Sequence, residues 1–207
     1  MRATTILSVL VMFIVTATVV EGQTRRLSPR GQVSTQVGGN LDADGKYDGG
    51  KWIDIEYGRP ILRGRENIWG SGDDYGQRFL QGSSVWRIGA DQSTRFTTEA
   101  DLVLGNNQLK AGEYTIFAET TSPSEWTLIF TTWGVKQSFR EENDAALWGS
   151  YDYTPVKDVL RATMRVQQIG RSADQLIIAF TNMTQEGGDF TIWWDDQVAT
   201  IPFTVAN

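Results

Sequence analysis

Residues 84–94 place a cation and an anion close together in a segment that begins with the composition of a buried strand. Strand alternation puts Trp86 and Arg87 on opposite faces. Burying an arginine in an aromatic strand without a partner is costly, so we expect a carboxylate or carbonyl oxygen beside Arg87. Asp91 follows a Gly-Ala break and is one candidate. The pair is either a structural brace for the turn or part of a ligand site.

Further arginines and aromatic residues favour a binding site at one end of the fold. Guanidinium groups bind carboxylates and phosphates, and aromatic rings stack on sugars or apolar ligands. We therefore predict a non-catalytic binding or envelope protein with a pocket for an anionic or sugar-like ligand. An anionic ligand requires at least two arginines to converge on one cavity without carboxylate partners. The predicted pocket residues are Tyr57, Arg59, Arg65, Trp86, Arg87, Asp91 and Arg161.

Carboxylates give the alternative prediction, a hydrolase or lyase that acts on polysaccharide. Asp91 with Glu56, or Asp195 with Asp196, would supply an acid and a base. Adjacent residues of a strand point to opposite faces, so Asp195 and Asp196 are not expected to act as a facing pair. The residue types for catalysis are present, whereas the sequence gives no site geometry.

An acidic segment copies the start of a calcium-binding EF-hand loop, N-x-D-x-D-G. Its ligand-type residues are Asn40, Asp42, Asp44 and Asp48. The twelfth position is Lys51 instead of the bidentate Glu, and the following residues alternate like a strand. Two interpretations stay open, an irregular calcium loop and an Asp/Gly hairpin turn without metal. No other cofactor is predicted.

Composition excludes several classes of function. The 207 residues include no histidine and no cysteine, which excludes Ser-His-Asp and Cys-His catalysis, His-ligated zinc and disulfides. Any metal would need oxygen ligands, which favours calcium, magnesium or manganese. The formal charge of −6, without a basic run, argues against nucleic acid as a partner.

Residues 1–22 have the pattern of a secretory signal peptide. Arg2 precedes an apolar run at residues 6–20, which is shorter than the roughly 20 residues that a membrane span needs. Cleavage after Gly22 would leave a secreted or periplasmic chain that does not span the membrane. The alternative is an uncleaved anchor.

Short strands must position the candidate residues. Residues 52–57 and 159–168 alternate most clearly between apolar and polar. Their core-facing residues are predicted to be Ile53, Ile55 and Tyr57, and Leu160, Ala162, Met164 and Val166. About ten such segments with little helix predict an all-β fold, either an antiparallel two-sheet sandwich, jelly-roll-like, or a closed barrel.

Residues 66–82 form a loop long enough to be functional. We expect a linker or edge strand at residues 23–39 and one domain at residues 40–207.

Short motifs also carry a resemblance to a known family. They are Tyr57-Gly58-Arg59-Pro60 with Arg63-Gly64-Arg65, Val85-Trp86-Arg87-Ile88-Gly89-Ala90, Ala111-Gly112-Glu113-Tyr114-Thr115-Ile116-Phe117, Trp148-Gly149 and Asp158-Val159-Leu160-Arg161. In spacing and order, residues 32–170 resemble the bacterial exported family called domain of unknown function 2911. The resemblance implies one all-β domain, secreted or periplasmic, and supplies no reaction. The family usually has Asn at the position of Asp91, and residues 40–50 look like an insertion.

Overall fold

The computed structural model describes residues 26–120 and 122–206. The predicted signal peptide, residues 1–22, lies outside these residues. The elements are β1 (Arg30–Leu41), β2 (Tyr47–Gly58), η1 (Gly72–Asp74), β3 (Thr94–Thr98), β4 (Leu102–Leu104), β5 (Asn107–Leu109), β6 (Gly112–Glu119), β7 (Glu125–Thr131), β8 (Gly134–Val135), β9 (Ala146–Leu147), η2 (Pro155–Lys157), β10 (Asp158–Thr181) and β11 (Gly187–Val205). Within the described ranges, the two helical elements are three-residue 3₁₀ turns, and no helix is long and apolar enough to cross a membrane.

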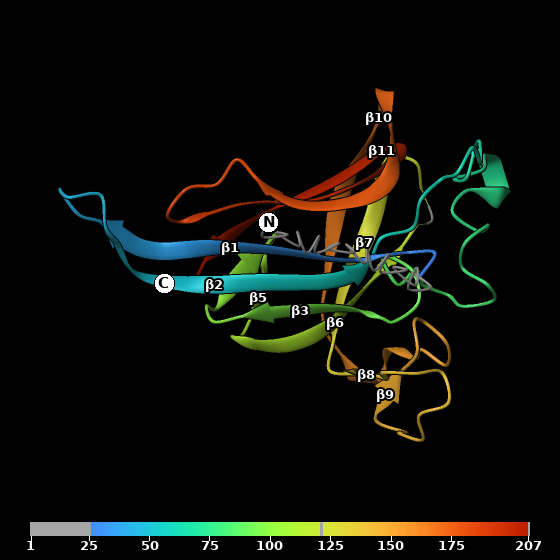
Figure 1. Ribbon diagram of the computed structural model, residues 1–207, viewed down its shortest axis with the longest axis horizontal. Helices are drawn as coiled ribbons and strands as arrows, with labels where there is room; N and C mark the ends of the chain where they lie inside the picture. Colours follow the sequence, from blue (N-terminus) through green and yellow to red (C-terminus); the bar gives the residue numbers. More distant parts are fainter. Residues whose placement is uncertain (1–25, 121, 207) are drawn as a thin grey trace, which may run out of the picture.

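Nine of the strands form one antiparallel sheet in the order β1-β2-β3-β6-β7-β10-β11-β4-β5 (Figure 1). The short strands β8 and β9 pair in parallel outside it. The all-β prediction is therefore confirmed. The division into two sheets is not confirmed, because strand pairing runs without a break from β1 to β5. Near the C-terminus the sheet has two long strands, β10 and β11, which pair with register shifts.

The sheet curls back so that its β1 edge meets the β10–β11 hairpin. The Gly38 amide donates to the Gln185 carbonyl at 2.6 Å. The segment after β2 pairs with β10, where the Leu62 amide donates to the Asp174 carbonyl at 2.6 Å. These contacts bring the long loop after β2 onto the middle of β10.

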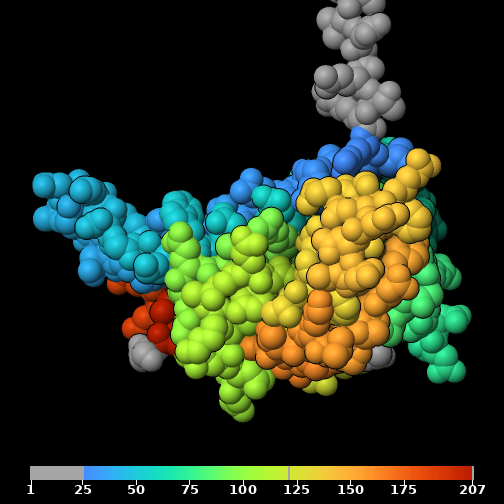
Figure 2. All heavy atoms as spheres, turned by 90° about the horizontal axis from the view of Figure 1, so that it is seen from below, coloured from blue at the N-terminus to red at the C-terminus, as the bar shows by residue number. Residues whose placement is uncertain are grey.

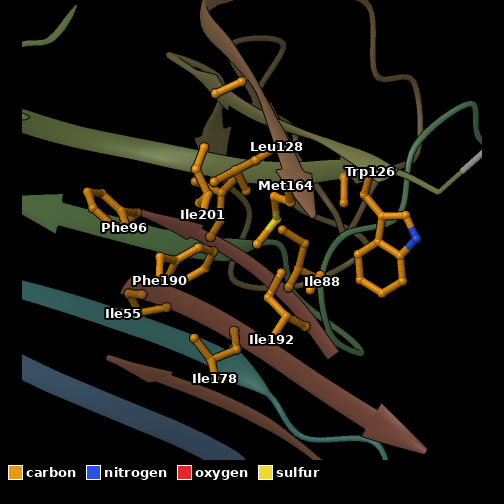
Figure 3. Close-up of a cluster of buried hydrophobic side chains, with 14 of the residues drawn as sticks. Ile55, Ile88, Phe96, Trp126, Leu128, Met164, Ile178, Phe190, Ile192 and Ile201 are labelled. Atoms are coloured by element: carbon orange, nitrogen blue, oxygen red, sulfur yellow. The ribbon is translucent and has the colours of Figure 1, made fainter. Parts of the chain in front are cut away.

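The apolar core lies inside this curled sheet and receives side chains from most strands. Figure 3 shows Ile55, Phe96 and Leu128, from β2, β3 and β7, pointing toward Met164 of β10 and Phe190 of β11. The predicted inner faces of residues 52–57 and 159–168 are confirmed, since all of their predicted core residues are buried. Those residues are Ile53, Ile55, Tyr57, Leu160, Ala162, Met164 and Val166.

Six aromatic rings pack together at one end of the core: Trp69, Tyr75, Phe79, Trp86, Trp126 and Trp194. Trp69 and Trp126 have ring centroids 4.8 Å apart, and Trp86 stacks on Trp194 at 5.9 Å. Such pairs add stability beyond the burial of their area. The cluster joins the loop after β2 to β7 and β11.

Residues 85–88 make a single bridge to β6 instead of a longer strand. The Trp86 amide donates to the Ala118 carbonyl at 2.8 Å, and the reverse bond is 2.9 Å. The predicted alternation still holds, because Trp86 and Ile88 enter the main core while Arg87 lies on the other side.

The two ends of the molecule carry different features. The tip of the β1–β2 hairpin, with the acidic segment, projects beyond the body (Figures 1 and 2). The long loop that contains η1 lies at the opposite end (Figure 1). The acidic segment is therefore remote from the aromatic cluster.

Gly58, at the end of β2, packs closely against the turn that follows Arg87, and a substitution there tests this contact. A methyl group at this position would overlap the Ala90 carbonyl oxygen. We expect Gly58→Ala to lower the free energy of unfolding by about 1–3 kcal/mol in urea denaturation, because the backbone must move. Gly170→Ala is the matched control, since nothing lies within 4 Å of its added methyl group. Equal stability of the two variants would contradict the proposed close contact.

Candidate functional site

A cleft of about 760 Å³ lies between the loop after β2 and the bent middle of the β10–β11 hairpin. Most of the residues that line it are polar. The carboxylate residues are Glu66, Asp174, Asp195 and Asp196, and the amide residues are Asn67, Gln168 and Gln197. Trp69 and Tyr75 supply aromatic surface, and Arg65 supplies the single guanidinium in the wall. This cleft is the candidate site because it combines polar groups from three segments with an aromatic wall.

A reversal of strand alternation in β11 builds one side of the cleft. Trp194 is buried, and the next buried residue is Gln197, three positions later. Asp195 between them has a positive φ of 52°, and the register with β10 shifts beside it. Simple alternation predicts opposite faces for Asp195 and Asp196, and this prediction is wrong, because the irregular backbone places both residues in the wall of one cleft.

Hydrogen bonds hold both carboxylates in place. Asp195 accepts from the Ser172 hydroxyl at 2.9 Å. Asp196 accepts from the Gln168 amide at 2.6 Å and from the Gln197 amide at 3.1 Å. These bonds fix the side chains before any ligand arrives, which lowers the entropy cost of binding.

Gln197 carries a buried oxygen without a partner. The residue is 5% exposed, and its amide nitrogen donates to Asp196. Its carbonyl oxygen Oε1 has no hydrogen-bond partner among residues 26–120 and 122–206. A buried polar atom without a partner costs about 1–3 kcal/mol. The amide group of Gln197 therefore serves the cleft through its N–H bond to Asp196.

The opposite side of the cleft is a loop held by its aromatic residues. The indole N–H of Trp69 donates to the Trp194 carbonyl at 3.1 Å, and the indole N–H of Trp126 donates to the Tyr75 hydroxyl at 3.1 Å. Burial raises the pKa of Tyr75, and the hydrogen bond from Trp126 partly offsets this. The loop is thus anchored to the aromatic cluster, although it has little regular structure.

Sequence reasoning identified only part of this cleft. Arg65 was predicted as a ligand-binding residue, and Asp195 and Asp196 entered the catalytic alternative. Gln168, Ser172 and Gln197 were not predicted. One feature of the sequence does indicate Gln197. Every second residue back from Phe203 is a core residue, Ile201 and then Ala199, and the next position in this pattern is Gln197. The pattern therefore places an amide at a core position.

Arg87 lies outside the cleft, in a buried network of its own. It is 8% exposed and donates to the Asp91 backbone carbonyl at 3.0 Å and to the Gln81 side-chain oxygen at 3.1 Å. The Tyr151 ring lies 5.6 Å from the guanidinium carbon. Burial lowers the pKa of Arg87, and Tyr151 and Asp91 act in the opposite direction. The expected oxygen partner is therefore present as a carbonyl of Asp91 rather than as its carboxylate.

The other predicted pocket residues lie apart from each other. Trp86 is in the aromatic cluster, and the buried Tyr57 hydroxyl accepts from the Ile178 amide at 3.0 Å. Arg59 is half-buried and donates to the Leu176 carbonyl at 3.2 Å. Arg161 donates to Asp158 at 2.9 Å and also pairs with Glu119. The structure does not bring Arg59, Arg87 and Arg161 into one cavity. Glu56, named with Asp91 in the catalytic alternative, pairs with Arg30 at 3.4 Å.

The arrangement around Arg161 is a closed charge network. The Tyr153 hydroxyl donates to both oxygens of Asp158, at 3.0 and 2.8 Å. Burial and the Asp158 carboxylate raise the pKa of Tyr153. Hydrogen bonds to Glu119 and Asp158 outweigh desolvation and raise the pKa of Arg161. All these groups are already paired, so the network is suited to joining β10 to β6.

Residues 42–203 match the family described as "Protein of unknown function (DUF2911)". The chain belongs to this family. The predicted resemblance is thereby confirmed, and all of the motifs that carried it lie within the match. No curated protein and no solved structure matches the chain.

In this DUF2911 protein the acidic segment forms the β1–β2 turn. Asn40 pairs with Asp48 across the hairpin. Asp42 Oδ1 accepts from the backbone amides of Asp44 at 3.1 Å and Lys46 at 2.8 Å. Among the described residues, no group of three or more His, Cys, Asp or Glu side chains is placed to hold a metal. We propose that Asn40, Asp42, Asp44 and Asp48 serve as turn residues.

Calcium sensitivity distinguishes the two interpretations of this turn. We expect the melting temperature to be the same in calcium and in chelator, because Asp42 Oδ1 already serves two amides. Asp42→Ala should lower stability by about 1 kcal/mol in both buffers, since two turn hydrogen bonds are lost. Asp48→Ala, an exposed neighbour without such bonds, is the control. A calcium-dependent rise in melting temperature that both variants abolish would establish a calcium loop instead.

Arg87→Lys tests whether the planar guanidinium is needed in its buried network. Lysine cannot reach the Asp91 carbonyl and the Gln81 oxygen with the same fork. We expect a loss of about 1–3 kcal/mol in the free energy of unfolding, measured by chemical denaturation. The exposed Arg140→Lys should change stability by less than about 0.5 kcal/mol. If the two variants are equally stable, the network does not depend on the guanidinium.

Proposed function

We propose that this protein is an exported, non-catalytic binding protein that holds a sugar-like, polyhydroxyl ligand in the cleft. Export rests on the signal-peptide pattern of residues 1–22. The observation that carries the binding proposal is the convergence of carboxylate and amide groups on one cleft beside Trp69 and Tyr75. The hydroxyl groups of a ligand would donate to these acceptors.

The composition of the wall supports a ligand rich in hydroxyl donors. Ionised carboxylates only accept hydrogen bonds, and the cleft holds four such residues against one arginine. A sugar presents several hydroxyl donors to such a wall, whereas an anion placed among the carboxylates would be repelled. Trp69 and Tyr75 add apolar surface that suits the C–H face of a sugar ring.

One observation also favours the enzyme alternative, a hydrolase or lyase acting on polysaccharide. Asp195 and Asp196 line the same cleft. Their carboxylates, however, are already engaged by Ser172, Gln168 and Gln197. A carboxylate held by amide donors is better placed to accept hydrogen bonds from a ligand than to transfer a proton to it. Binding without reaction is therefore the first proposal.

Gln197→Met gives the sharpest test of the binding proposal. The change keeps the side-chain volume and removes the amide group that donates to Asp196 in the wall of the cleft. We expect it to weaken binding of a neutral oligosaccharide by about tenfold or more, because Asp196 is then no longer held in place for the ligand. Stability should change little, since removal of the unpartnered Oε1 offsets the loss of the hydrogen bond to Asp196. Calorimetric titration with maltopentaose, cellopentaose and xylopentaose measures the affinity, and thermal melting measures the stability.

Gln108→Met, on the exposed edge strand β5, is the matched control and should keep wild-type affinity. Failure of all three pentasaccharides to bind the wild-type protein at millimolar concentration would overturn the proposal. Mass spectrometry of the same mixtures distinguishes binding from catalysis. Intact pentasaccharide is expected, and shortened products would establish the enzyme alternative.

A further inference from the structure

A second pocket, of about 340 Å³, adjoins the cleft and shares Arg65 and Glu66 with it. The remaining residues of its wall are Ile68, Arg78, Phe79 and Trp194. The residues of the cleft are mostly acidic or neutral, whereas this pocket has two guanidinium groups and one carboxylate. The boundary between the acidic cleft and this pocket lies at Arg65 and Glu66, which line both.

Both arginines are held by carbonyl groups. Arg65 donates to the Leu62 carbonyl at 3.0 Å and the Ile61 carbonyl at 2.8 Å. Arg78 donates to the Asn67 carbonyl at 2.7 Å. Neither arginine forms an ion pair with a carboxylate of residues 26–120 or 122–206, Glu66 included. The two positive charges are thus positioned but not neutralised.

Trp194 adds aromatic surface to the same pocket. The residue is 3% exposed, and its indole N–H is buried out of reach of a ligand. The guanidinium carbon of Arg65 lies 5.9 Å from the centre of the Trp194 ring. The pocket therefore sets two guanidinium groups beside apolar surface from Phe79, Ile68 and Trp194.

We propose that this pocket is an anion subsite that binds the carboxylate of an acidic sugar whose neighbouring ring lies in the cleft. Arg65 and Arg78 neutralise the carboxylate, and Trp194 and Phe79 contact the apolar face of the sugar ring. The cleft and the subsite adjoin, so one oligosaccharide can reach both. This inference rests on the proposed function and narrows its ligand from sugars in general to oligosaccharides that carry a single uronic acid.

A tetrasaccharide of three xylose units and one glucuronic acid, and the methyl ester of that acid, test the subsite, because they share linkage and length and differ by one charge. We expect the wild-type protein to bind the acid at least about tenfold more tightly than the ester in calorimetric titration at low salt. Arg78→Gln should abolish this preference and leave the affinity for the ester unchanged, since Arg78 lies outside the wall of the cleft. Arg63→Gln, an exposed loop arginine that lines neither pocket, should retain the preference.

The outcomes separate the two proposals. Equal affinity for acid and ester in the wild-type protein would overturn the anion subsite and leave the binding cleft standing. A preference for the acid that persists in Arg78→Gln would also overturn the subsite. Both proposals would be supported if Gln197→Met weakens binding of the ester and Arg78→Gln loses the preference for the acid. If neither tetrasaccharide binds and the neutral pentasaccharides also fail, both proposals fall.

Discussion

The reversal of side-chain alternation between Trp194 and Gln197 is the constraint on which the cleft depends. Before it, the indole of Trp194 enters the aromatic cluster, and after it an amide occupies the core-facing position. The irregular register with β10 turns Asp195 and Asp196 to the same cleft. A regular strand would have sent one of these two carboxylates to the other face and left three carboxylate residues in the wall.

Aromatic packing gives this irregular region its stability. A bulge and a long loop have few ladder hydrogen bonds, so other contacts must hold them. Here the Trp69 indole donates to the Trp194 carbonyl, next to the bulge, and its ring packs against Trp126. The two walls of the cleft are therefore fastened to one cluster. A site built in this way loses little conformational entropy when a ligand binds.

The sequence predicted the parts of the fold that follow from local alternation. The core faces of β2 and β10, and the opposite placement of Trp86 and Arg87, are all set by the two-residue period of a strand. The cleft was less accessible to such reasoning, because a positive φ at Asp195 and the contact between Leu62 and Asp174 depend on distant chain segments. The run from Gln197 to Phe203 carried a local signal, since a glutamine occupies a core position there.

The arginines divide according to the oxygen atoms that hold them. Arg161 is neutralised by two carboxylates and has no charge left for a ligand. Arg87 is satisfied by a carbonyl, an amide oxygen and an aromatic ring, and its burial closes it to ligands. Arg65 and Arg78 are also held by neutral carbonyl groups, but they are exposed at a pocket. Neutral acceptors orient a guanidinium without cancelling its charge, so these two remain able to attract an anion.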